Sequence, residues 1–222
     1  MKRKTIILLV ILAVLLLVVG GAVCWQWNNI TAVRFALQYS QEEQAAMEQE
    51  TNKIIEEISE QFSGMDFSLL PEEAKEQLAK GELSEEDAVS ILTGKTTWEE
   101  VKNKQTPTGG VSAVQPSRVD EIIAQIYVLR SGYTGKIDAL VSQAVADYRA
   151  KKGTKSELMS KYISLGYGLE GECNAKMEAL LTELQKELKR TGGDTALIGQ
   201  IRSAYQTEKS LKKAAIIEKY QK

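Results

Sequence analysis

The feature that most constrains this chain is an apolar run near its N-terminus, Thr5 to Val23, which contains no charged residue. Its 19 residues would form a helix of about 28 Å, close to the roughly 30 Å hydrocarbon core of a bilayer. Three basic residues precede the run and two tryptophans follow it, where an aromatic belt marks a membrane interface: Lys2, Arg3, Lys4, Trp25 and Trp27. The pattern predicts a signal anchor over residues 1–24, a single-pass transmembrane helix with a cytoplasmic N-terminus and an extracytoplasmic body.

Processing of the N-terminus would change that prediction. Gly20 and Ala22 are small residues that suit signal-peptide cleavage, which would leave a secreted helical protein. Lipidation at Cys24 fits less well. A lipoprotein signal has a large aliphatic residue three places before the cysteine and a small one directly before it, whereas Gly21 and Val23 reverse that order.

Beyond the anchor, the composition and the spacing of apolar residues favour an all-α fold, because only 3 of 222 residues are proline. Apolar residues in steps of three and four predict a helical stalk over residues 25–63, continuous with the membrane helix, with a coiled-coil seam at Ile30, Val33, Leu37, Met47, Ile54 and Ile58. Polar residues dilute this seam at Ser40, Gln44 and Thr51. It fits weak self-association or docking on another helix; an amphipathic helix packed on its own domain is the alternative.

Capping signals divide the middle of the chain into short helices. Within residues 64–105 they predict helices at about 71–80, 84–93 and 97–104, started by Pro71, by Ser84 with Asp87, and by Thr97 with Glu100. Residues 106–116 contain prolines, adjacent glycines and no charge. They predict a flexible linker.

Residues 117–222 predict an antiparallel three-helix bundle, because three long helices follow one another with short connections. The expected starts and stops are Ser117, Gly153, Thr154, Gly192 and Asp194. The first helix has an apolar stripe of Val119, Ile122, Ile126, Leu129, Tyr133, Ile137, Leu140 and Tyr148. The stripe of the second is Leu158, Tyr162, Leu165, Leu169, Met177, Leu180, Leu184 and Leu188.

Three glycines in the second helix, Gly166, Gly168 and Gly171, match the pattern Gly-x-Gly-x-x-Gly. A dinucleotide site requires a strand before such glycines, whereas here the helical spacing runs through them. We therefore expect no dinucleotide. Each glycine costs a helix up to about 1 kcal/mol, so we interpret the three as sites of close helix packing, with a kink or local break as the alternative.

Residues for common catalytic chemistry are scarce. The chain has no histidine, and its only cysteines, Cys24 and Cys173, are far apart in the sequence. Ser210 and Lys213 have the spacing of a Ser-x-x-Lys acyl enzyme but lack its supporting motifs. We expect no catalytic residue, no cofactor and no metal, and we expect that the chain is not an enzyme. A disulfide through Cys24 to another chain stays open.

Charge is distributed unevenly along the chain, with 7 basic against 17 acidic residues over 25–116 and 18 against 13 over 117–222. The basic bundle fits an anionic envelope polymer, an acidic partner or the acidic stalk, and scattered solvated charge is the simpler alternative. An outward-facing domain is not expected to meet nucleic acid.

The sequence thus predicts a membrane-anchored, non-catalytic scaffold or assembly protein of a bacterial-type cell envelope, in contact with the lipid bilayer and with a protein partner or itself. An extracytoplasmic ligand-binding or sensing module is the alternative.

Overall fold

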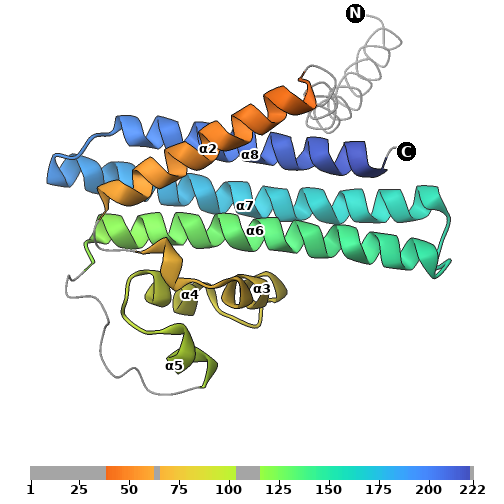
Figure 1. The fold of residues 1–222 in the computed structure, drawn as a ribbon, viewed down its shortest axis with the longest axis horizontal. Coiled ribbons are helices and arrows are strands. Elements are labelled where there is room, and N and C mark those ends of the chain that lie inside the picture. The colour runs from red at the N-terminus through yellow and green to blue at the C-terminus, as the bar shows by residue number, and fades with distance from the viewer. Residues whose placement is uncertain (1–38, 63–65, 104–115, 221–222) are drawn as a thin grey trace, which may run out of the picture. The chain divides into compact units, whose positions relative to one another are not determined.

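A computed structural model describes residues 39–62, 66–103 and 116–220, and its regular elements over these residues are all helices (Figure 1). This confirms the all-α class. The elements are α2 Gln41–Gln61, η1 Phe67–Leu69, α3 Glu72–Lys80, α4 Glu85–Leu92, α5 Trp98–Lys102, α6 Arg118–Arg149, α7 Lys155–Thr191 and α8 Ala196–Tyr220.

Several predicted features lie outside the described residues: the anchor with Lys2, Arg3, Lys4, Trp25 and Trp27, the seam residues Ile30, Val33 and Leu37, and nearly all of the linker 106–116. Over the described ranges, no helix combines the length and apolarity needed to cross a membrane. The transmembrane anchor therefore stays a prediction.

The chain divides into two compact units, one of Met1–Ile54 with Ser203–Lys222 and one of Ile55–Arg202. In the first unit the prediction of a continuous stalk is corrected at Ser40, since Tyr39 and Ser40 are not helical and α2 begins at Gln41. The Ser40 hydroxyl accepts from the Glu43 amide at 3.3 Å, and the Ser40 amide donates to the Glu43 carboxylate at 2.7 Å. Ser40 thus caps α2, as serine favours, and does not fill a seam position of a helix.

The short and long helices of the second unit begin at the predicted caps. Capping boxes form at Thr97 with Glu100, Ser117 with Asp120, and Thr154 with Glu157. The Ser84 hydroxyl caps α4 by accepting from the Asp87 amide at 3.0 Å. Gly192 ends α7 with a φ of 76°, a left-handed conformation that glycine adopts without a steric penalty.

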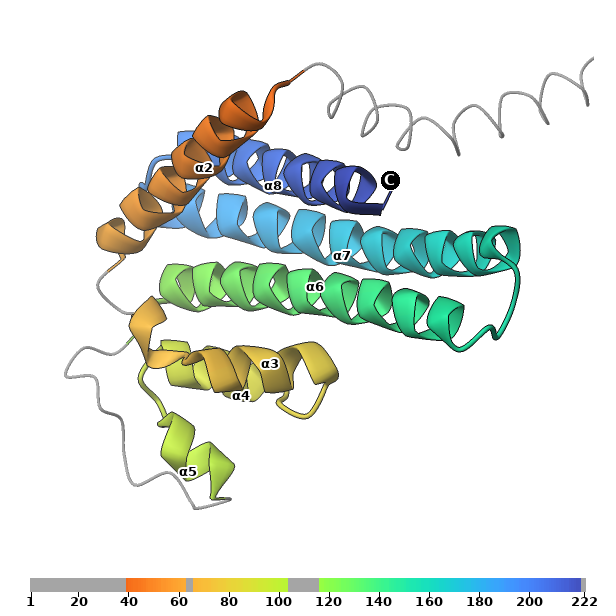
Figure 2. The same cartoon turned by 45° about the vertical axis from the view of Figure 1, so that its right-hand side comes forward.

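Helices α6 and α7 lie side by side as an antiparallel hairpin in both ribbon views (Figure 2). Of the stripe expected on α6, six residues are buried: Val119, Ile122, Ile126, Leu129, Tyr133 and Ile137. Tyr148, at the end of that stripe, is exposed. Helix α6 also buries a second face that the stripe did not predict: Ile123, Ala124, Val128 and Gly132.

The second face of α6 packs against α3 and α4. A Cβ placed on Gly132 would lie 3.6 Å from Leu78 Cγ of α3, and one placed on Gly135 would overlap Ala79 Cβ. The ring centroids of Phe67 and Tyr127 lie 4.3 Å apart at the same face. The short-helix segment is therefore part of the same unit as the hairpin.

Close packing at the three glycines of α7 is not what the described contacts show. A Cβ on Gly168 or Gly171 would have no neighbour within 4 Å other than the adjacent backbone of its own helix, and one on Gly166 would make an ordinary 3.8 Å contact with Leu140. Helix α7 runs unbroken from Lys155 to Thr191, so a local break is wrong too. The close approach that we expected here occurs instead at Gly135.

On α7 the buried face also departs from the predicted stripe. Leu165 is exposed, whereas Cys173 and Leu181 are buried. At 3.6 residues per turn, Leu165 lies about 120° from Met177 and about 160° from Leu181 around the helix. The predicted stripe was therefore too wide, because the buried side of α7 is the one that Met177 and Leu181 occupy.

Only the first turns of α8 belong to the second unit, where Arg202 donates two hydrogen bonds to the Glu178 carboxylate of α7 at 2.8 and 3.1 Å. The packing of all three long helices in one bundle stays a prediction.

Candidate functional site: the tip of the α6–α7 hairpin

The surface feature that stands out in the second unit is the tip of the α6–α7 hairpin, which we define as residues 147–165. It comprises the end of α6, the connection and the first turns of α7. The large apolar side chains that are exposed among the described residues all belong to it: Tyr148 at 57%, Met159 at 52%, Ile163 at 42% and Leu165 at 48%.

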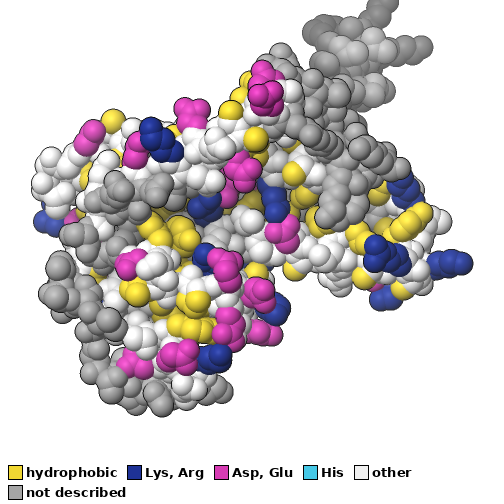
Figure 3. Space-filling view, viewed as in Figure 1, with side chains coloured by type: hydrophobic (Ala, Val, Ile, Leu, Met, Phe, Trp, Pro, Cys, Tyr) yellow, Lys and Arg dark blue, Asp and Glu magenta, His cyan; other side chains and the backbone are white. Residues whose placement is uncertain are grey.

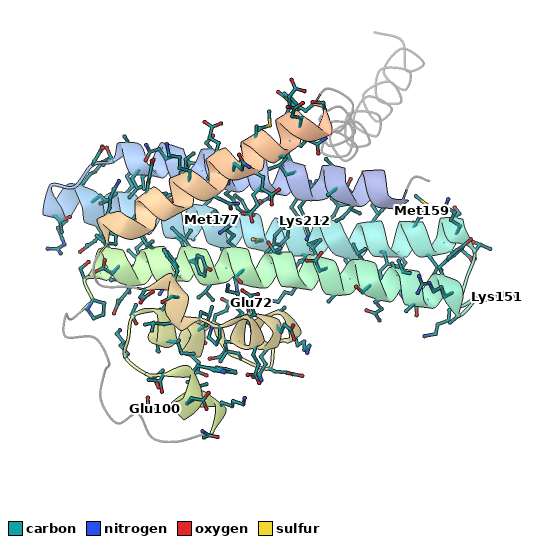
Figure 4. All side chains as sticks on the ribbon, viewed as in Figure 1. Glu72, Glu100, Lys151, Met159, Met177 and Lys212 are labelled. Atoms are coloured by element: carbon teal, nitrogen blue, oxygen red, sulfur yellow. The ribbon has the colours of Figure 1, made fainter. Side chains whose placement is uncertain are left out.

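Basic residues are also concentrated at the hairpin tip. The hairpin tip contains five lysines and arginines, Arg149, Lys151, Lys152, Lys155 and Lys161, against only Asp147 and Glu157. The space-filling view shows apolar and basic side chains together at this end of the hairpin (Figure 3). Lys151 and Met159 mark the same end in the view with side chains (Figure 4).

The turn that forms the tip follows from its local sequence. The Ala150 amide donates to the Ala146 carbonyl at 2.9 Å and ends α6. Lys151 then has a φ of 53°, in the left-handed region that a non-glycine residue seldom adopts. Thr154 starts α7, since its hydroxyl accepts from the Glu157 amide at 3.3 Å and its amide donates to the Glu157 carboxylate at 2.8 Å.

Asp147 joins the two helices at the hairpin tip. Its side chain is 9% exposed, and it accepts a hydrogen bond of 2.6 Å from the Tyr162 hydroxyl of α7. The ammonium groups of Lys152 and Lys161 lie 2.9 and 3.5 Å from the same carboxylate. Lys161 also lies 4.8 Å from the centre of the Tyr162 ring, within the range of a cation–π contact.

These contacts set the electrostatics of the cluster. The hydrogen bonds from Tyr162 and then Lys152 lower the pKa of Asp147 from 3.8 to about 2. The same carboxylate raises the pKa of Tyr162 and of Lys152 by accepting their hydrogen bonds. Asp147 is therefore ionised at neutral pH and fixes the positions of its neighbours, while the apolar side chains beside it remain exposed.

A second charged surface of this unit lies on its short helices. Residues 66–103 contain ten acidic and four basic residues, and acidic side chains gather over α3 to α5 (Figure 3). Two ion pairs join this surface to the hairpin, Lys95 with Glu121 at 2.6 Å and Lys176 with Glu85 at 2.9 Å. A third pair, Lys102 with Glu73 at 2.9 Å, lies within the surface. The unit is thus acidic on its short helices and basic at the hairpin tip.

The residues that the sequence singled out do not meet at the hairpin tip. Of the stalk seam, Met47 and Ile54 are half-buried and Ile58 is buried on α2. Ser210 and Lys213 lie on α8, where the Ser210 hydroxyl donates to the Gln206 carbonyl at 3.0 Å. Over the part of the chain that the structure describes, no group of three metal-ligating side chains comes together.

Sequence reasoning assigned Tyr148 and Leu165 to apolar stripes and so missed their exposure. Residues 149–155, RAKKGTK, do provide a signal, since they place four basic residues around one glycine. The signal becomes specific only when the exposure of Met159 and Ile163 beside it is known.

The arrangement at the hairpin tip supports non-covalent binding, because exposed apolar area and cationic side chains are available together. Comparison of the chain with protein-family models, with curated proteins and with solved structures finds no match.

Proposed function

We propose that this chain is a membrane-anchored scaffold or assembly protein of a bacterial-type cell envelope, and that the hairpin tip is its docking surface. The observation that carries the proposal is the gathering of exposed large apolar side chains among basic residues at that tip. Met159 and Ile163 are one helical turn apart on α7, and neighbouring exposed apolar side chains mark binding surfaces more often than isolated ones do.

The hairpin supports the scaffold part of the proposal. At 1.5 Å per residue, the 32 residues of α6 and 37 residues of α7 extend for about 48 and 55 Å. Their caps and the Asp147 contacts fix the end of this rod. Such a shape separates a docking surface from the opposite end of the hairpin, as a spacer does.

The apolar run Thr5 to Val23, with its preceding Lys2, Arg3 and Lys4, supports the anchored part. A cysteine engineered at Lys222 should react with a membrane-impermeant maleimide in intact cells, because basic residues flank the run only on its N-terminal side. The parent chain, which keeps Lys222, measures the background from Cys24 and Cys173.

The same cells test anchoring. The chain should stay in the membrane pellet after alkaline carbonate extraction. Labelling of the Lys222→Cys variant only after lysis would overturn the orientation, and release by carbonate would overturn the anchor.

A further inference from the structure

We propose that the hairpin tip binds the surface of an anionic lipid bilayer, as a membrane contact separate from the N-terminal anchor. The inference deepens the proposed function, on which it rests for the role of the tip as a docking surface, by naming the partner. It does not depend on the anchor, because it concerns residues 147–165 alone.

The apolar part of the tip has the character of a membrane-interface contact. Met159 and Ile163 are four residues apart on α7, so their side chains are neighbours on one face of the helix. Tyr148, the most exposed of the four apolar residues, contributes an aromatic ring with a polar hydroxyl. Such side chains favour the boundary between lipid headgroups and acyl chains.

The basic part supplies attraction to lipid phosphates. Arg149, Lys151 and Lys155 are exposed in or beside the connection. Each lysine or arginine near an anionic membrane strengthens binding by about fivefold. Their long side chains reach phosphates while the apolar side chains enter the interface below them, which a basic amphipathic surface requires.

A second copy of this chain could pair with the basic residues of the hairpin tip but not with its apolar residues. The acidic α3 to α5 region would pair with the basic residues, but none of the exposed large apolar side chains among the described residues lies there. Soluble anionic polymers have the same defect, since they offer charge without an apolar phase. An anionic bilayer offers both at once, and its mobile headgroups need no fixed complementary shape.

Flotation with lipid vesicles tests the inference on the full chain. The chain is first reconstituted in nanodiscs of phosphatidylcholine, so that its predicted anchor is occupied. It is then mixed with vesicles of phosphatidylcholine alone or of phosphatidylcholine mixed with phosphatidylglycerol. We expect co-flotation with the phosphatidylglycerol vesicles, weakening as salt is added.

Matched charge variants locate the binding. Lys151→Gln with Lys155→Gln should bind roughly 25-fold more weakly, about fivefold for each lost charge. The control is Lys186→Gln with Lys189→Gln, which removes the same charge from exposed positions near the other end of α7. This control should bind as the parent does.

A third variant distinguishes binding to a lipid bilayer from binding to a soluble anionic polymer. Met159→Gln with Ile163→Gln leaves all charges in place and should weaken vesicle binding by roughly tenfold, because apolar area no longer enters the interface. Soluble polyglutamate, tested in place of vesicles, should bind the parent weakly, and it should bind this variant equally well. Thermal melts of each variant confirm that the fold is retained.

Three results would overturn the inference: equal binding to both vesicle types, equal losses in the tip and control lysine variants, or full binding by the Met159 and Ile163 variant. Failure of the anchor is seen separately, as a chain that does not enter nanodiscs. In that case flotation of the chain without nanodiscs still tests the tip. Binding of this free chain to vesicles of phosphatidylcholine alone would show that its N-terminal apolar run is exposed and binds lipid.

Discussion

Asp147 is the residue on which the contacts across the hairpin tip converge, with Tyr162, Lys152 and Lys161 around one carboxylate. A carboxylate with a lowered pKa stabilises a fold only while it is ionised. At the glycines of the long helices, the space available to a new Cβ decides whether a substitution stabilises or destabilises the protein. Both cases give predictions for single side chains.

Removal of the Asp147 charge should destabilise the protein in a pH-dependent way. The pKa of Asp147 is lowered from 3.8 to about 2, so its contribution is complete above about pH 4 and is lost as the pH falls through about 2. Asp147→Asn should therefore melt below the parent at pH 7, and the difference in melting temperature should shrink between pH 4 and pH 2.

Glu172→Gln, at an exposed position of α7, is the control for a general change of charge, and it should melt close to the parent at pH 7. A difference for Asp147→Asn that stays constant or widens toward acid pH would contradict the role given to this carboxylate.

Gly135 and Gly168 should respond oppositely to alanine. At Gly135 the new Cβ would meet Ala79 Cβ, with the Ala79 Cα at 3.3 Å, so a helix must shift. Overpacking of this kind costs about 1–3 kcal/mol. At Gly168 the position is open and helical, and alanine should stabilise the chain by roughly 0.5–1 kcal/mol. Chemical denaturation measures both, and destabilisation by Gly168→Ala would refute the account of α7.

At the scale of the helical elements, the sequence predicted where helices begin better than which faces they bury. The capping pairs Thr97 with Glu100 and Thr154 with Glu157 act over three residues, so a local pattern contains all of their chemistry. Burial of Ala124 and Val128 depends on α3, far away in the sequence. The exposure of Tyr148 and Leu165 likewise depends on which sides of α6 and α7 other helices cover, and the spacing of apolar residues alone does not reveal those sides.

The cap at Thr154 is an element-scale feature that can be tested alone. Thr154→Ala removes the acceptor for the Glu157 amide at the start of α7, and the loss of such a cap costs about 0.5–2 kcal/mol. Thr182→Ala is the matched control, because Thr182 is exposed inside the same helix and its hydroxyl donates only to the Glu178 carbonyl. Equal losses of unfolding free energy in the two variants would contradict the capping role.

At the scale of the whole chain, one compact unit includes residues on both sides of the predicted linker. Leu78 of α3 is 3% exposed, and its Cγ faces Gly132 of α6. The short helices therefore complete the core beside the hairpin. The sequence predicted only the basic part of the candidate site at the tip. The exposure of its apolar side chains depends on how the helices of the unit pack, which the local sequence does not show.

Leu78→Ala should destabilise the hairpin as well as α3, by about 2–5 kcal/mol, because it opens a cavity in a shared core. Hydrogen exchange of the α6 amides should accelerate in this variant. Leu165→Ala, a matched change at an exposed position, should alter the unfolding free energy by less than about 0.5 kcal/mol. Exchange that accelerates in α3 alone would mean that the two segments unfold independently.

The short turn between α6 and α7 also sets the order in which the hairpin can form. Tyr162 and Asp147 are 15 residues apart in the sequence, whereas Arg118 and Glu183 at the open end are 65 apart. Closing the smaller loop has the lower entropic cost, and each later contact is then local to the helices already paired. We therefore expect the two helices to pair first at the turn, so that the proposed docking surface is also the place where the hairpin starts to fold.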